Sequence, residues 1–283
     1  MKRAKLCLLV LLAFSAGIAV QIFWPLEWWR TLGMKALQRL RHGESPAILA
    51  EKKNVMVALT FGQSNAANSG ETRHSAGPGV YSLFGGKIFP ARDPIRGATG
   101  VGGSVWPRLG DRLMKDGKFD AIVFRCCAAH GSAIAQWAPG GGLHSRLLDA
   151  IRDCQDSGLK ITHLLWHQGE ADAETSPAEY ARLFHAMLAA IRAQGVDAPI
   201  YVSVATASPR LVSTDALRRA QEALVQPQES IMPGPDSDLL GAEMRHDGVH
   251  FSTAGLGHLS ELWFEALVPG VKTPTQPTQP PQN

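Results

Sequence analysis

Residues 55–65 read VMVALTFGQSN, an uncharged and mostly apolar run that ends in glycine, glutamine, serine and asparagine. A short apolar run that stops at turn residues predicts a strand buried on both faces. Comparable runs at 121–125, 161–166 and 200–205 alternate with amphipathic, helix-length segments at 105–115, 143–156, 177–194, 214–225 and 253–267. This alternation predicts a single α/β domain: a three-layer α/β/α, doubly wound parallel sheet.

Polar segments follow the predicted strands, at the sheet edge where such folds bind their ligands. Gly62-Gln63-Ser64-Asn65 follows the first strand, and Trp166-His167-Gln168-Gly169-Glu170 follows the third. Gly102-Gly103-Ser104 opens a helix, and Asp247-Gly248-Val249-His250 precedes the last one.

These residue types suit acyl transfer. A sharp turn raises the Ser64 hydroxyl above the sheet edge, although Ala66 replaces the second glycine of the G-x-S-x-G elbow. In a turn, Asp247 can orient the imidazole of His250, three residues later, to take the serine proton. The Gln168 amide can donate to an oxyanion, and N–H groups at the 102–104 turn can point at negative charge.

A catalytic metal is not predicted. His246 and His250 resemble a ligand pair, but no H-E-x-x-H motif or cysteine cluster accompanies them. We therefore expect neither a metal nor an organic cofactor. The net charge of +3 is scattered along the chain, so no nucleic-acid partner is expected either.

Together the motifs resemble, in order, those of the SGNH hydrolases, within them the sialate O-acetylesterase-like and plant carbohydrate esterase branch. The matching residues are GQSN at 62–65, WHQGE at 166–170 and D-x-x-H at 247–250 followed by Phe251 and Ser252. The stretch GSAIAQW at 131–137 also looks like the branch's segment between its second strand and helix. The resemblance covers about residues 55–267.

The resemblance implies a serine esterase that removes acetyl groups from a carbohydrate and has a flavodoxin-like fold. Ser64 would be the nucleophile, His250 the base and Asp247 its orienting carboxylate. The oxyanion donors would be the Ser64 N–H, the Gln168 side chain and a glycine N–H, for which Gly102 and Gly103 both qualify and Gly103 is preferred. Asn65 and Glu170 would support the site.

A sugar could stack on an aromatic ring near the site. Trp137, and secondarily Trp106, are the candidates for this contact, although packing in the core is the more common fate of a tryptophan.

The N-terminus predicts export. Lys2, Arg3 and Lys5 precede a charge-free run over residues 6–26, which fits either an uncleaved membrane anchor or a cleaved signal peptide. Both place the body outside the cytoplasm, in the periplasm or the extracellular space. Residues 27–53 then form a juxtamembrane linker, residues 54–268 the catalytic domain, and residues 269–283, rich in Pro, Thr and Gln, a disordered tail.

The cysteines leave two readings open. Cys126 and Cys127 are neighbours on a predicted strand and point to opposite faces, so at most one can face the helix with Cys154. Either one disulfide forms or all three are buried free thiols.

Two rival functions share the motifs. A membrane-tethered transferase would pass the acyl group to a sugar hydroxyl instead of water. A non-catalytic carbohydrate-binding domain would keep the cleft alone, but the retained triad side chains argue against it.

Overall fold

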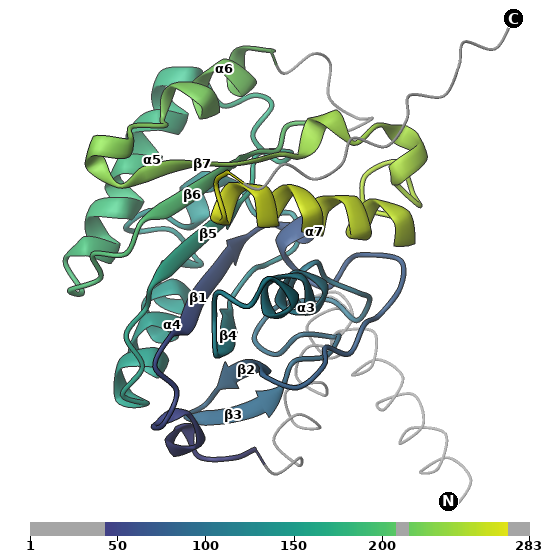
Figure 1. Ribbon diagram of the computed structural model, residues 1–283. Helices are drawn as coiled ribbons and strands as arrows, with labels where there is room; N and C mark the ends of the chain where they lie inside the picture. Colours follow the sequence, from purple (N-terminus) through teal and green to yellow (C-terminus); the bar gives the residue numbers. More distant parts are fainter. Residues whose placement is uncertain (1–42, 208–214, 271–283) are drawn as a thin grey trace, which may run out of the picture. The chain divides into compact units, whose positions relative to one another are not determined.

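The run at 55–61 forms the central strand of a seven-stranded sheet in the computed structural model, which describes residues 43–207 and 215–270 (Figure 1). The strand order is β3-β2-β4-β1-β5-β6-β7, and all neighbouring pairs are parallel except β2 and β3. The strands are β1 Val55–Gly62, β2 Val80–Phe84, β3 Lys87–Pro90, β4 Ala121–Cys126, β5 His163–His167, β6 Ile200–Val204 and β7 Ile231–Asp236.

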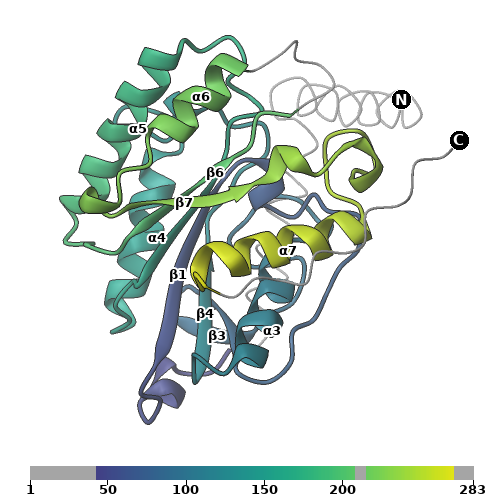
Figure 2. The same cartoon turned by 45° about the horizontal axis from the view of Figure 1, so that its top comes forward.

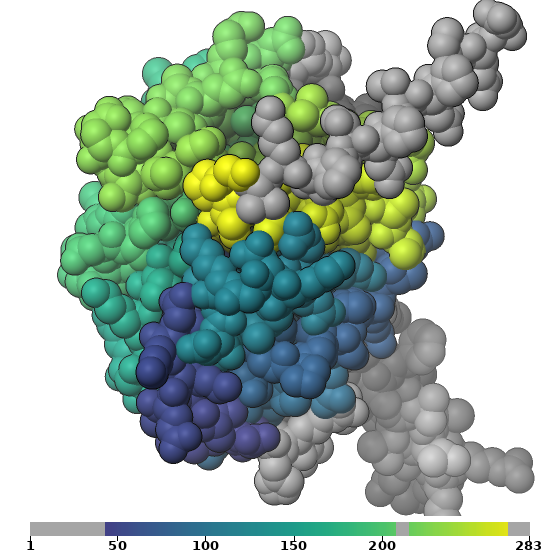
Figure 3. Space-filling model, viewed as in Figure 1, coloured from purple at the N-terminus to yellow at the C-terminus, as the bar shows by residue number. Residues whose placement is uncertain are grey.

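Helices cover both faces of the sheet (Figure 2). On one face α4 (His144–Asp156), α5 (Pro177–Arg192) and α6 (Asp215–Ala223) share a core with alternate β1 residues such as Leu59. On the other face α3 (Trp106–Asp116) and α7 (Thr253–Leu267) pack with the intervening residues such as Ala58. The two helices lie against each other (Figure 3). Between them, the ring centroids of Trp106 and Trp263 are 5.6 Å apart. The predicted three-layer, doubly wound fold is confirmed.

The sequence reading missed three strands. β2 and β3 form a hairpin around Gly85 and Gly86, which have φ of 60° and 72°. Adjacent glycines between two apolar runs are a recognised hairpin signal. β7 reads IMPGPD, and its prolines suit only an edge strand, which is where it lies.

Part of the predicted linker belongs to the folded body. Glu44 pairs with Ile88 of β3 through backbone bonds of 2.8 and 2.9 Å, and Leu49 is buried. The charge-free run at 6–26 and the tail from residue 271 lie outside the described residues. Among the helices that are described, none has the length and apolar character needed to cross a membrane.

The three cysteines in the described part of the chain, Cys126, Cys127 and Cys154, are buried free thiols. Cys126 lies in the core under α3 and α7, whereas Cys127 and Cys154 share the core of the opposite face. The prediction that Cys126 and Cys127 point to opposite faces of the sheet is confirmed.

Candidate active site

Ser64 lies at the carboxyl end of β1, where a tight turn begins. Gly62 has φ of 129°, and a Cβ there would collide with the carbonyl of His167 on the neighbouring strand, so glycine is required. Ser64 then opens a 3-10 turn, Ser64–Ala66, and is 5% exposed. Neither its N–H nor its hydroxyl has a hydrogen-bond partner within residues 43–207 and 215–270. Both groups are therefore available to a ligand.

Asp247 and His250 form the expected carboxylate–imidazole pair in the turn before α7. Asp247 Oδ2 lies 2.6 Å from His250 Nδ1, and Oδ1 accepts the N–H groups of Val249 at 2.9 Å and His250 at 2.7 Å. Burial of Asp247 opposes its ionisation, but the hydrogen bonds from His250 and Val249 outweigh it and hold the carboxyl pKa below its usual range. Because Nδ1 is bonded to Asp247, Nε2 is the imidazole nitrogen that remains to take a proton.

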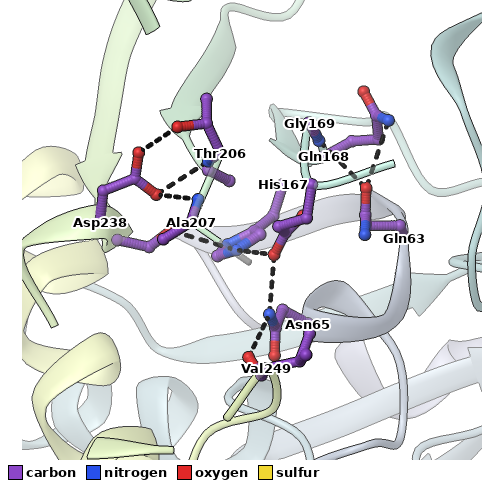
Figure 4. Close-up of polar contacts among 12 residues, drawn as sticks. Gln63, Asn65, His167, Gln168, Gly169, Thr206, Ala207, Asp238 and Val249 are labelled. Atoms are coloured by element: carbon purple, nitrogen blue, oxygen red, sulfur yellow. Dashed lines mark hydrogen bonds and ion pairs between the residues drawn. The ribbon is translucent and has the colours of Figure 1, made fainter. Parts of the chain in front are cut away.

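Asn65 joins this turn to the serine turn. Its Nδ2 donates to Val249 O at 3.2 Å and to Glu170 Oε1 at 2.7 Å (Figure 4). Arg245 Nη1 donates to the same Val249 carbonyl at 2.5 Å. The residue after Ser64 is thus bonded to the residue before His250. This link brings the two ends of the described chain into one site, although Ser64 and His250 share no hydrogen bond here.

Glu170 is buried behind Asn65. Burial raises its pKa to about 7, against the opposing effect of the Asn65 hydrogen bond. Its Oε2 has no partner among the described residues, and His167 Nε2 lies 4.0 Å from Oε1. Burial, with a smaller effect of Arg245, lowers the His167 pKa to about 3, so this imidazole is neutral at physiological pH. The supporting role of Glu170 stays a prediction, and its contact with Asn65 is the bond through which it would act.

Gln168 does not reach the site surface. The side chain is fully buried, and its Nε2 donates to Ser132 O at 3.0 Å and to Asp172 Oδ2. Its Oε1 accepts from the Tyr180 hydroxyl at 3.0 Å. An amide whose two N–H groups are already occupied cannot also donate to an oxyanion, so the expected direct role is corrected to an internal one.

The glycine donors expected at 102 and 103 are also occupied. The Gly102 N–H bonds Asn68 O at 2.9 Å, and the Gly103 N–H bonds Gly70 O at 2.8 Å. A Cβ at Gly103 would collide with the carbonyl of Thr72, so close backbone packing explains this glycine. The preference for Gly103 as an oxyanion donor is therefore not supported by its geometry.

Gly131 is a candidate donor that was not predicted from the sequence. It follows β4 in an exposed turn, and its N–H has no partner among the residues described. The turn lies beside the end of β1, because the Ala129 N–H and the Ser132 hydroxyl bond Gly62 O at 3.0 and 3.3 Å. The GSAIAQW stretch at 131–137, which begins five residues after the end of β4, carried the signal for this donor.

The tryptophans expected to hold a sugar are part of the core. Trp137 and Trp106 are fully buried. Trp137 packs against Phe61 and Trp166, and its Nε1 donates to Ser132 Oγ at 3.0 Å. Trp106 Nε1 donates to Ala66 O at 2.7 Å. Neither ring has a face free for a sugar, so both expectations are corrected.

His246 stands beside the catalytic pair. Potential metal-ligand atoms of His246, Asp247 and His250 lie within 4.8 Å of one another. However, His246 Nε2 contacts Ser69 O at 3.2 Å, and Asp247 and His250 are bonded to each other. The contacts thus favour a hydrogen-bonded pair over a ligand set.

Comparison with known proteins gives a family and a fold. The family described as "Carbohydrate esterase, sialic acid-specific acetylesterase" matches residues 54–268. No curated protein matches the chain.

Three similar solved structures agree in fold. A protein of Arabidopsis thaliana has a TM-score of 0.61 at 20% identity, over 76% of this chain and 98% of that one. NanS has a TM-score of 0.56 at 17% identity, over 76% and 97%. A variant of an acetyl xylan esterase from Geobacillus stearothermophilus has a TM-score of 0.54 at 12% identity, over 77% and 97%.

Proposed function

Because the chain belongs to the sialic acid-specific acetylesterase family of carbohydrate esterases and is a carboxylic ester hydrolase, we propose that Ser64, His250 and Asp247 cleave O-acetyl esters of a carbohydrate. The observation that carries the proposal is the Asn65–Val249 bond, which ties the Asp247–His250 turn to the serine turn.

The chemistry follows from the positions of these groups. His250 takes the proton of Ser64 as its hydroxyl attacks the acetyl carbonyl, and Asp247 stabilises the imidazolium that forms. The oxyanion is held by the unoccupied N–H groups of Ser64 and Gly131. Collapse expels the sugar hydroxyl with the His250 proton, and water then releases acetate from the acyl-enzyme. The substrate is an acetylated sialate, xylan or exopolysaccharide type of sugar.

We also propose that the enzyme works outside the cytoplasm. Support comes from Lys2, Arg3 and Lys5 before the charge-free residues 6–26. Cell-surface and secreted polysaccharides would then be the accessible substrates.

Acetate release from a panel of acetylated sialic acids, xylans and bacterial exopolysaccharides tests the reaction. We expect Ser64→Ala to abolish release while the protein stays folded, because the hydroxyl forms the acyl-enzyme but makes no hydrogen bond in the described fold. Asp247→Asn should retain more activity than His250→Ala, since the turn still holds the imidazole. A folded Ser64→Ala protein with wild-type turnover would refute the mechanism. Acetate release without an added sugar acceptor distinguishes hydrolysis from transfer.

A further inference from the structure

Gln63, directly before the nucleophile, is held in one orientation by its neighbours. Its side-chain oxygen accepts the N–H group of Gly169 at 3.2 Å and contacts Gln168 Nε2 at 3.3 Å (Figure 4). It also accepts the N–H group of Ala171 at 3.1 Å. Turning the amide over would place its N–H groups against the backbone donors of Gly169 and Ala171. The hydrogen bonds therefore place the Gln63 oxygen toward Gly169 and Ala171 and the Gln63 nitrogen on the opposite side of the amide.

The Gln63 nitrogen, in contrast, has no acceptor within residues 43–207 and 215–270. The side chain is only 3% exposed. Enclosed side-chain atoms without a partner occur at Thr60, His167, Glu170, Ser203 and Trp263, and the Gln63 nitrogen is not one of them. It is thus an unpaired donor that is mostly buried but still reachable from outside.

We propose that Gln63 Nε2 donates to the acyl carbonyl oxygen of the substrate, taking the role that the buried Gln168 does not have. This inference rests on the proposed function. Gln63 immediately precedes Ser64, and Gln168 Nε2 contacts both Gln63 Oε1 and Ser132 O, so the Gln63 amide lies near the serine turn and the Gly131 turn. A preoriented, mostly desolvated donor is the kind of group that stabilises a developing oxyanion. Gln168 then acts as a positioning residue, through Gln63 Oε1 and the Ser132 carbonyl beside Gly131.

Gln63→Glu tests the proposal because it separates the two halves of the amide. The carboxylate keeps an oxygen for the Gly169 and Ala171 N–H groups but removes the outward donor. We expect kcat to fall roughly 100-fold or more with KM little changed, while the melting temperature is kept. Gln63→Met, which has similar length and no charge, should also lose kcat, and so separates loss of the donor from repulsion by a carboxylate.

Under the competing hypothesis, Gln63 has only a structural role and holds the loop at 169–171 in place. Under that hypothesis Gln63→Glu keeps wild-type kcat and Gln63→Met loses stability first. Full kcat in a folded Gln63→Glu protein overturns the proposal.

Labelling of Ser64 by a fluorophosphonate gives a second readout. Because the labelling reaction also develops charge on an oxygen, its rate should fall in both variants in parallel with kcat; an unchanged rate overturns the proposal. Wild-type protein and Ser64→Ala are run beside them. If the wild type releases no acetate from any substrate, the proposed function fails; if it does and Gln63→Glu is equally fast, only the role of Gln63 fails.

Discussion

Glu170 shows how a single buried group can support the site and still lower stability. One carboxylate oxygen holds Asn65, which in turn bonds the carbonyl before His250. The other oxygen has no partner in the described part of the chain. A buried carboxylate with one oxygen unpaired is costly to ionise, as its raised pKa indicates. The ionised form is therefore present at neutral pH at the expense of folding free energy.

Replacing Glu170 by glutamine should remove this cost. The folded pKa of about 7 exceeds the ordinary 4.5, so the folded protein binds more protons between these values. The free energy of unfolding therefore falls as pH rises through this window, by ~3 kcal/mol in total for this group. We expect the free energy of unfolding of Glu170→Gln, measured with urea, to exceed that of the wild type by more at pH 8 than at pH 4.5. The increase in this difference should be ~3 kcal/mol.

A pH-independent difference between the Glu170→Gln and wild-type stabilities would contradict this account. Because the amide oxygen can still accept from Asn65, kcat should remain within a few-fold of wild type.

Residue roles were harder to predict than residue positions. The sequence alone indicated where Gln168 and Gly103 lie along the fold, but a donor's use depends on whether an acceptor from another segment already occupies it. Ser132 O and Asp172 occupy Gln168, and Gly70 O occupies Gly103. Ser132 and Gly70 come from other segments of the chain, whereas Asp172 lies four residues after Gln168, and sequence spacing reveals none of these bonds. The predicted sugar contact of Trp137 was wrong for a related reason. Whether a ring is buried on all sides depends on how the whole core packs, which the sequence around Trp137 does not show.

At the scale of elements, periodicity predicted the central strands and the helices and missed the β2–β3 hairpin and the edge strand β7. β1, β4, β5 and β6 carry apolar runs because helices cover both of their faces. β7 has prolines at 233 and 235 and a glycine at 234, so strand propensity is low and only pairing with β6 makes it a strand. The β2–β3 hairpin carried a readable signal in Gly85 and Gly86.

Asn65 connects two of these elements, the turn after β1 and the loop before α7, so its loss should affect catalysis more than stability. Without the Asn65 bond, Arg245 is the only side chain within residues 43–207 and 215–270 that still donates to Val249 O. A small displacement of the base costs much in rate, so Asn65→Ala should lower kcat roughly 10- to 100-fold with KM changed less. Steady-state kinetics on the acetylated substrate measures this.

Asn68→Ala is the matched control for Asn65. Asn68 is an equally buried amide in the same segment, but it bonds the backbone of Ile95 and Ala98 instead of the catalytic turn. It should lose stability while keeping more of its kcat. Equal kcat losses in the two variants would show that Asn65 acts only through general packing.

At the scale of the whole molecule, the site joins segments far apart in the sequence. The proposed nucleophile follows the first strand and the proposed base precedes the last helix, yet both lie at the carboxyl edge of one sheet. The strand order makes this possible because β1 is central and β4 and β5, which flank it, supply the Gly131 turn and the loop with Glu170. A truncation at either end of residues 54–268 would therefore remove part of the catalytic apparatus.

The proposed export can be tested on the full chain in a bacterial host. Alkaline phosphatase and green fluorescent protein are each fused after Gly270. Alkaline phosphatase is active only outside the cytoplasm. Green fluorescent protein fluoresces in the cytoplasm but not after export by the general secretory route. We expect phosphatase activity and no fluorescence, because the positive charges at residues 2–5 stay inside while the charge-free run at 6–26 enters the membrane. Deleting residues 6–26 is the control and should reverse both signals. Fluorescence from the undeleted fusion, without phosphatase activity, would place the esterase in the cytoplasm and exclude external polysaccharides as its substrates.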